Sequence, residues 1–144
     1  MAIFERDMMS LVNKLNLKSH TDILVLNAPP AFEKELNLLA GVRISNHLLI
    51  AKGVTFALLF VTRKAELDRL LKAITTRMHV DIVLWFAYPK GSTSNSTVDL
   101  NRDSDWDVIR RAGFEIVQQV SIDANWSARR FRRREFVEYE SGCG

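Results

Sequence analysis

The chain lacks the residues on which small secreted proteins and fibrous proteins depend. Its one cysteine, Cys143, allows neither an internal disulfide nor a cysteine-based zinc site. Six glycines and three prolines in 144 residues exclude a collagen-like chain, and 47% hydrophobic with 26% charged residues exclude disorder and coiled coils. These absences indicate a globular protein, and the cysteine content fits a reducing cytoplasm best.

No apolar stretch is long enough to cross a bilayer. The longest stretches, residues 54–61 and 82–88, are far shorter than the roughly 20 residues that a spanning helix needs. Residues 1–10 mix acidic and basic side chains, which argues against a secretory signal. We therefore expect no membrane partner and a cytoplasmic location.

The length favours one domain with one core over residues 1–144. Apolar residues at helical spacing predict an amphipathic helix over residues 3–15, so that residues 1–20 form a helix and a loop. Small residues near the other end predict a flexible tail over residues 138–144.

Three short apolar runs predict strands that are buried on both faces. They span residues 22–26, 55–61 and 82–88. Residues 42–44 form a weaker strand candidate. Helical patterns over residues 31–39 and after Thr62, which can cap the second helix, separate these strands. Strands alternating with helices favour a parallel sheet joined by right-handed crossovers.

The last third of the chain predicts a helix and a hairpin. Ser104 is the expected N-cap of the helix and Gly113 lies just beyond its end. Residues 114–121 and 128–137 each alternate apolar and polar side chains, and we expect them to pair antiparallel. In the first of these strands, the residues expected to point partly inward are Phe114, Ile116, Val117 and Val120. The predicted fold class is α/β: a Rossmann-like, mostly parallel sheet with helices on both faces and a C-terminal antiparallel hairpin.

Short motifs follow the expected strands. They read Asn27-Ala28-Pro29, Tyr88-Pro89-Lys90 and Asp123-x-x-Trp126-Ser127-x-x-Arg130-Phe131. Together they resemble a family of small bacterial proteins of unknown function. At the level of the fold, residues 20–137 resemble the class I methyltransferases. The resemblance implies a methyltransferase-like fold and a cytoplasmic location, and it implies no particular reaction.

The chain departs from methyltransferases where they bind S-adenosylmethionine. In that family a glycine-rich turn after the first strand lets backbone amides approach the cofactor, whereas here the turn is Asn27-Ala28-Pro29-Pro30. An acidic residue that binds the ribose hydroxyls ends their second strand, whereas this chain has Ile44-Ser45-Asn46. We therefore predict no cofactor, and a divergent S-adenosylmethionine-dependent methyltransferase remains an alternative.

Ligands of open α/β sheets bind beyond the carboxyl ends of the parallel strands. This rule brings Asn27, Thr62 and Lys90 to one edge, where a small anion could bind; the alternative is an ordinary solvated loop over residues 91–97. A second group around Asp123 either lines a pocket or is structural, with Asp123 capping a turn and Trp126 serving as an anchor. The expected ligand-binding residues are Asn27, Lys90, Ser92, Asp123, Trp126, Ser127 and Arg130.

Neither a metal site nor a catalytic group stands out. His20, His47 and His79 fall in unrelated segments without metal-like spacing, and no nucleophile stands close to a base. The leading hypothesis is therefore a non-catalytic or small-anion-binding methyltransferase-like domain that acts through a small anionic ligand or a protein partner. An enzyme that uses Lys90 and Asp123 on a phosphorylated metabolite is a further alternative.

Five arginines between Arg129 and Arg134 form the strongest charge feature of a chain whose net charge is only +3. On a strand, Arg130, Arg132 and Arg134 would share one face, and Arg129, Phe131 and Arg133 the other. Such a ribbon could bind the phosphates of nucleic acid, which is a second functional hypothesis. The alternative is a charged edge strand that prevents aggregation.

Overall fold

The computed structural model describes residues 12–17, 20–36, 41–46, 54–77, 81–91, 100 and 106–137. Within the helix expected over residues 3–15, residues 12–14 are helical, and residues 1–11 lie outside the described part. Ser92, most of the loop over residues 91–97 and the tail over residues 138–144 also lie outside it.

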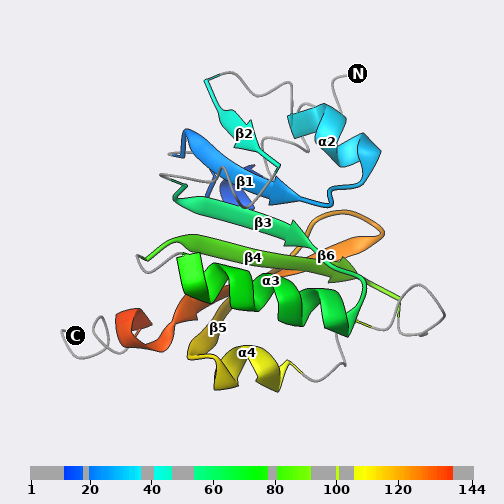
Figure 1. Ribbon diagram of the computed structural model, residues 1–144. Coiled ribbons are helices and arrows are strands. Elements are labelled where there is room, and N and C mark those ends of the chain that lie inside the picture. Colours follow the sequence, from blue (N-terminus) through cyan, green and yellow to red (C-terminus); the bar gives the residue numbers. More distant parts are fainter. Residues whose placement is uncertain are drawn as a thin grey trace.

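Six strands form one sheet in the order β2-β1-β3-β4-β6-β5 (Figure 1). β1, β2, β3 and β4 run parallel, and β6 runs antiparallel to both β4 and β5. This confirms the predicted fold class, a mostly parallel sheet with a C-terminal antiparallel hairpin. The strands are β1 (Asp22–Leu26), β2 (Arg43–Ser45), β3 (Phe56–Phe60), β4 (Val83–Pro89), β5 (Phe114–Ser121) and β6 (Trp126–Arg133).

Helices cover both faces of the sheet, as predicted. α3 (Lys64–Arg77) and α4 (Asp107–Arg111) lie on one face, in front of the sheet in Figure 1. α2 (Pro30–Leu36) and residues 12–17 pack on the other face. Within the described ranges, no helix combines the length and the apolar character that crossing a membrane requires.

β3 shows why the central strands read as continuous apolar runs. Phe56, Leu58 and Phe60 pack in the core on the α2 side, and Ala57 and Leu59 pack in the core on the α3 side. Every side chain of the strand is buried. Because both faces are covered, the polar half of the usual alternation is absent.

Trp85 fixes residues 12–17 to the sheet. Its side chain is fully buried in the middle of β4, and its Nε1–H donates a 2.9 Å hydrogen bond to the Leu15 carbonyl. Leu15 and Leu17 are buried in the same core. One polar contact inside an apolar layer therefore sets where the N-terminal segment lies.

Both helices after β3 begin later than predicted. α3 begins at Lys64, so Thr62 is not its N-cap. α4 begins at Asp107 with Trp106 at the N-cap position and no side-chain cap, which makes the predicted start at Ser104 wrong. Trp106 is buried against the rings of Tyr88 and Phe131, so packing sets the start of α4.

The hairpin differs from the prediction in one strand and at one bulge. β6 ends at Arg133 and residues 134–137 are helical, so the strand predicted over residues 128–137 is shorter at its end and begins earlier. In β5 the register shifts between Ile116 and Gln118, which leaves Val117 as an extra residue. Ile116 and Val117 are 43% and 40% exposed, so the prediction that they point partly inward is wrong.

We predict that Trp85→Phe lowers the free energy of unfolding by about 2–4 kcal/mol, because it leaves the Leu15 carbonyl unpaired and an unfilled volume in the core. Urea denaturation measures the change. Trp126→Phe, at a partly buried ring whose N–H has no hydrogen-bond partner among the described residues, is the control and should cost less. Equal losses in the two variants would contradict the anchoring role of Trp85.

Candidate functional site

The turn after β1 begins with a residue whose backbone conformation is unusual for any residue other than glycine. Asn27 has a φ of 59°, in the left-handed region that asparagine tolerates better than most residues. Pro30 is the first residue of α2, and the Glu33 N–H donates to the Pro29 carbonyl at 3.0 Å. The chain therefore reverses from strand to helix within three residues.

Glu66 ties this turn to the beginning of α3. Asn27 Nδ2 donates to Glu66 Oε2 at 3.2 Å and makes a longer contact, 3.4 Å, with the Phe60 carbonyl. The other carboxylate oxygen, Oε1, accepts the Thr62 N–H at 3.1 Å. We did not predict this role from the sequence, because Glu66 follows Thr62 by four residues whereas a capping box has a spacing of three.

These residues do not fit S-adenosylmethionine. Pro29 and Pro30 have no backbone N–H, and the Asn27 amide already donates to Glu66. Ser45 and Asn46, which end β2 and follow it, offer no carboxylate for ribose hydroxyls. The turn that would receive a cofactor is instead closed by contacts within the chain.

Aromatic rings fill the space between this turn and the hairpin. Phe60, the last residue of β3, makes edge contacts with Phe32 of α2 and Trp126 of β6, at centroid distances of 5.2 and 5.1 Å. Trp126 pairs with Pro89 in the ladder and packs against the core. Trp126 therefore anchors the hairpin, as its structural interpretation predicted.

Lys90 lies beside the turn that joins β5 to β6. Its N–H donates to the Asn125 carbonyl at 3.0 Å, and its Nζ donates to Ser121 Oγ at 2.6 Å. Asp123 caps the turn, because its Oδ1 accepts the N–H groups of Asn125 and Trp126 at 2.7 and 2.9 Å. The capping role expected for Asp123 is thus confirmed.

The predicted ligand-binding residues do not all meet. Ser127 lies opposite Ser121 in the ladder, which places it near Lys90 and Asp123 at the hairpin turn. Asn27 lies two strands away, at the end of β1. Arg130 lies opposite Trp85, further along β6.

Arg130 influences a histidine on the α2 side of the sheet. Burial, and then the positive charge of Arg130, lowers the pKa of His20 below its ordinary 6.5. His20 Nδ1 lies 2.6 Å from Thr55 Oγ1, and its ring lies 5.5 Å from that of Phe56. Arg130 therefore acts here through its charge on a neighbouring group.

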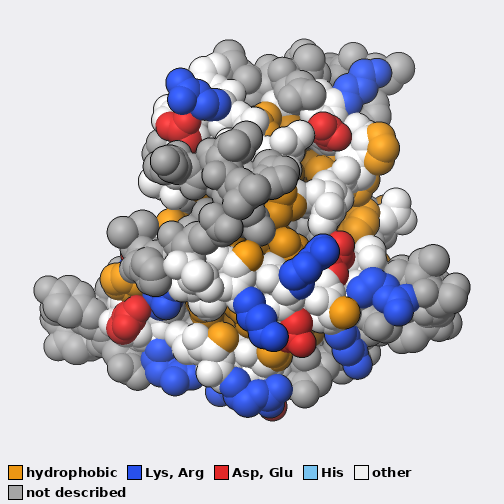
Figure 2. All heavy atoms as spheres, in the orientation of Figure 1, with side chains coloured by type: hydrophobic (Ala, Val, Ile, Leu, Met, Phe, Trp, Pro, Cys, Tyr) orange, Lys and Arg blue, Asp and Glu red, His pale blue; other side chains and the backbone are white. Residues whose placement is uncertain are grey.

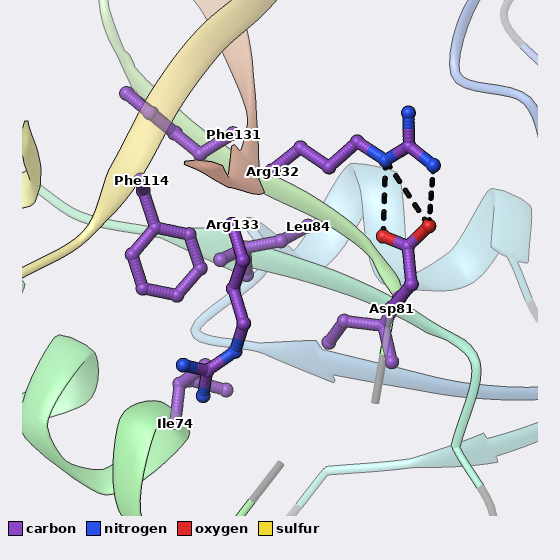
Figure 3. Close-up of a pocket in the computed structure, with 8 residues that line it drawn as sticks. Ile74, Asp81, Leu84, Phe114, Phe131, Arg132 and Arg133 are labelled. Carbon is purple, nitrogen blue, oxygen red and sulfur yellow. Dashed lines mark hydrogen bonds and ion pairs between the residues drawn. The ribbon is translucent and has the colours of Figure 1, made fainter. Parts of the chain in front are cut away.

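Two arginines of β6, Arg132 and Arg133, line the pocket in Figure 3 and make different contacts there. Arg132 Nη2 lies 2.6 Å from Asp81 Oδ2, and Arg132 Nε donates to both carboxylate oxygens at 3.1 Å. Arg133 points the other way, toward Ile74, with its guanidinium 5.3 Å from the centroid of the Phe114 ring. Arg132 thus forms an ion pair, whereas Arg133 packs over the ring of a core phenylalanine.

The two outer arginines of the run also have partners inside the molecule. The Arg129 guanidinium lies over the rings of Tyr88 and Trp106, at 5.5 and 5.1 Å. Arg134 Nε donates to Glu115 Oε1 at 2.9 Å. Arg129, Phe131 and Arg133 share the α3 side, as predicted, but Arg134 lies beyond the strand.

The interpretation of β6 as a charged edge strand is wrong, because β6 lies between β4 and β5. The arginines of β6 and Arg134 instead make contacts that hold the hairpin against the rest of the fold. Exposed cations gather instead over α3 and α4 (Figure 2), where Asp68 and Asp107 interrupt them. The exposed basic residues there are Lys64, Arg69, Lys72, Arg110 and Arg111.

Comparisons with known proteins give the fold and no family. No protein-family model and no curated protein matches the chain. Among solved structures, it is similar to N,N-8-amino-8-demethyl-D-riboflavin dimethyltransferase from Streptomyces davawensis, with 16% identity, a TM-score of 0.54 and 92% of this chain covered. It is also similar to mitomycin 7-O-methyltransferase, with 14% identity, a TM-score of 0.51 and 87% covered.

The chain spans 54% of the length of each of these two structures. At such identities the likeness shows the fold alone. The protein therefore has a methyltransferase-like, Rossmann-like fold.

We predict that Asp123→Ala lowers the free energy of unfolding by about 1–2 kcal/mol, because two backbone N–H groups lose their acceptor. Chemical denaturation measures the loss. Asp123→Asn keeps an oxygen at the same place and should cost less. If both variants were as stable as the parent, the cap would contribute nothing.

His20 predicts a stability that falls with acid. Because the folded state lowers the pKa of His20, the unfolded chain takes up a proton first as the pH drops through 6.5, and folding weakens until the folded pKa is passed. We expect the difference in unfolding free energy between the parent and His20→Gln to change across this window. A difference independent of pH would show that His20 titrates equally in both states.

Proposed function

We propose that this chain is a non-catalytic methyltransferase-like domain that binds a small anion beside Lys90. The observation that carries the proposal is the environment of the Lys90 ammonium. It is exposed at the carboxyl edge of the sheet, and among the described residues its partner is the neutral hydroxyl of Ser121, with no carboxylate in ion-pair distance. A cation held by a hydroxyl keeps its charge available to a ligand.

The neighbourhood of Lys90 supplies further donors. An ammonium group has three N–H bonds, and the Ser121 hydroxyl uses one of them. Ser127 places a second hydroxyl opposite Ser121 in the ladder. The Asp123 carboxylate lies at the same turn and opposes a highly charged ligand, so we expect a small anion of low charge, such as phosphate, and weak binding.

The non-catalytic part of the proposal rests on the turn after β1. The contacts from Asn27 to Glu66 and from Glu66 to Thr62 use the polar groups at the place where a cofactor would approach. With that turn closed, the chain keeps the scaffold of a methyltransferase and acts through its anion or through a protein partner in the cytoplasm. We do not extend the proposal to nucleic acid, because the arginines of β6 are engaged within the fold.

The test is the thermal midpoint of unfolding in the presence of phosphate, pyrophosphate or S-adenosylmethionine. We expect phosphate to raise the midpoint of the parent protein and of Lys72→Ala, a control that removes an exposed lysine from α3. Lys90→Ala should lose this response. S-adenosylmethionine at the same concentration should leave the midpoint unchanged.

Two results would overturn the proposal. A midpoint raised by S-adenosylmethionine and by S-adenosylhomocysteine would support the alternative, a divergent methyltransferase whose turn opens to admit the cofactor. A response to phosphate that survives in Lys90→Ala would place the anion elsewhere on the surface.

A further inference from the structure

The two outer strands of the sheet are protected to different degrees. β2 has three residues, and its Arg43, with a side chain 85% exposed, lies 3.6 Å from Asp22 on β1. β5 has eight residues and contains neither lysine nor proline. Its one charged residue, Glu115, is paired with Arg134. Short length, lysine, proline and a bulge are common means of preventing a strand from pairing at an edge, and β5 has only the bulge.

Apolar exposure is concentrated on this same strand. Among the described residues, the exposed large hydrophobic side chains are Ile116 and Val117, both in the middle of β5. Val117 is the extra residue at the register shift, and Ile116 directly precedes it. Isolated exposed apolar residues are common, but two adjacent ones on an outer strand indicate a surface whose burial against a partner would be favourable.

The ladder between β5 and β6 shows which backbone groups face outward. The Arg134 N–H bonds to the Gly113 carbonyl, and the Ile122 N–H bonds to the Trp126 carbonyl. In an antiparallel ladder, bonded and non-bonded pairs alternate, so these two bonds fix the phase on either side of the bulge. The residues that turn their N–H and C=O groups away from β6 are then Phe114, Ile116, Gln119 and Ser121.

These four outward-facing residues can pair with the same four residues of a second copy. In an antiparallel pairing about a two-fold axis between Val117 and Gln118, Phe114 lies opposite Ser121 of the second copy, and Ile116 lies opposite its Gln119. All four outward-facing residues then exchange backbone hydrogen bonds. The bulge of one strand lies opposite the bulge of the other, so the irregularity does not break the pairing.

The side chains agree with the same register. Glu115 lies opposite Val120 of the second copy, so that no two carboxylates face each other. The two copies of Val117 lie next to the axis, where each covers the other. In this register the charged residues, the apolar residues and the outward-facing backbone groups of β5 all find suitable partners in the second copy. β5 therefore fits a second copy of itself better than an unrelated strand.

We propose that a second copy of this chain pairs with β5 to form a symmetric dimer with one continuous sheet. The interface of a single strand pair is at the small end of specific interfaces, so we expect a weak dimer that forms at high protein concentration. The two hairpin turns, with Lys90 and Asp123, then lie on the dimer at positions related by the two-fold axis.

Sedimentation velocity of the full chain at high micromolar concentration tests the proposal. We expect the parent protein to be a dimer and Ile116→Lys/Val117→Lys to be a monomer with unchanged circular dichroism. Asn46→Lys, which adds one lysine beside the other outer strand, β2, is the control and should remain a dimer. A monomeric parent, or a dimer that survives both lysines, overturns the proposal.

Disulfide trapping tests the register independently of the lysine variants. In a Cys143→Ser background, Ile116→Cys/Gln119→Cys brings cysteines opposite each other across the axis, and we expect oxidation to give a covalent dimer. Ile116→Cys/Ser121→Cys places them out of register and should stay uncrosslinked. Equal crosslinking of the two pairs would mean that the copies meet in another way.

Discussion

β3 and β4 are covered on both faces, and this double burial fixes the places of the other elements. The side chains of β3 divide between a core under α3 and α4 and a core under α2 and residues 12–17. Apart from the bond from Trp85 to the Leu15 carbonyl, polar groups contact these strands near their ends. The turn closed by Glu66 and the hairpin turn beside Lys90 both lie there.

The same constraint explains the role of the arginines. β6 pairs with β4 in the sheet, so its side chains must lie against the layers that cover the centre. Long guanidinium side chains do this by crossing aromatic rings, as Arg129 crosses Tyr88 and Trp106, or by reaching carboxylates near the margin, as Arg132 reaches Asp81. The run of arginines that suggested a ligand-binding ribbon in the sequence instead makes stabilising contacts within the fold.

The sequence predicted what depends on local composition. β1, β3 and β4 are continuous apolar runs because of double burial, and Pro30 and Gly113 mark helix boundaries through their own backbone preferences. The contact of Asn27 with Glu66 joins residues 39 positions apart, and no local pattern indicates it. The alternating pattern also did not predict the bulge at Val117, because Ile116 and Val117 are both apolar and nothing in the pattern shows that one of them is an extra residue.

The candidate site divides in the same way. Lys90 and Asp123 lie at the same turn because Lys90 directly follows β4 and Asp123 lies between β5 and β6, and the sequence shows all three strands. Arg130 belongs to the same motif as Asp123, yet it lies further along β6 and faces Trp85. Asp123 precedes β6 and Arg130 is the fifth residue of that strand, so the extended backbone, at about 3.3 Å per residue, separates the two in space.

The insertion of β6 between β4 and β5 also bears on the order of assembly. During synthesis, β4 leaves the ribosome before its second neighbour in the sheet exists, and nearly forty residues must follow before Trp126 reaches Pro89. Throughout that interval the apolar margin of a half-built sheet is open to other nascent chains. Arg132 can reach Asp81, which lies just before β4, only when β6 has taken its place, so this ion pair belongs to the last stage of assembly.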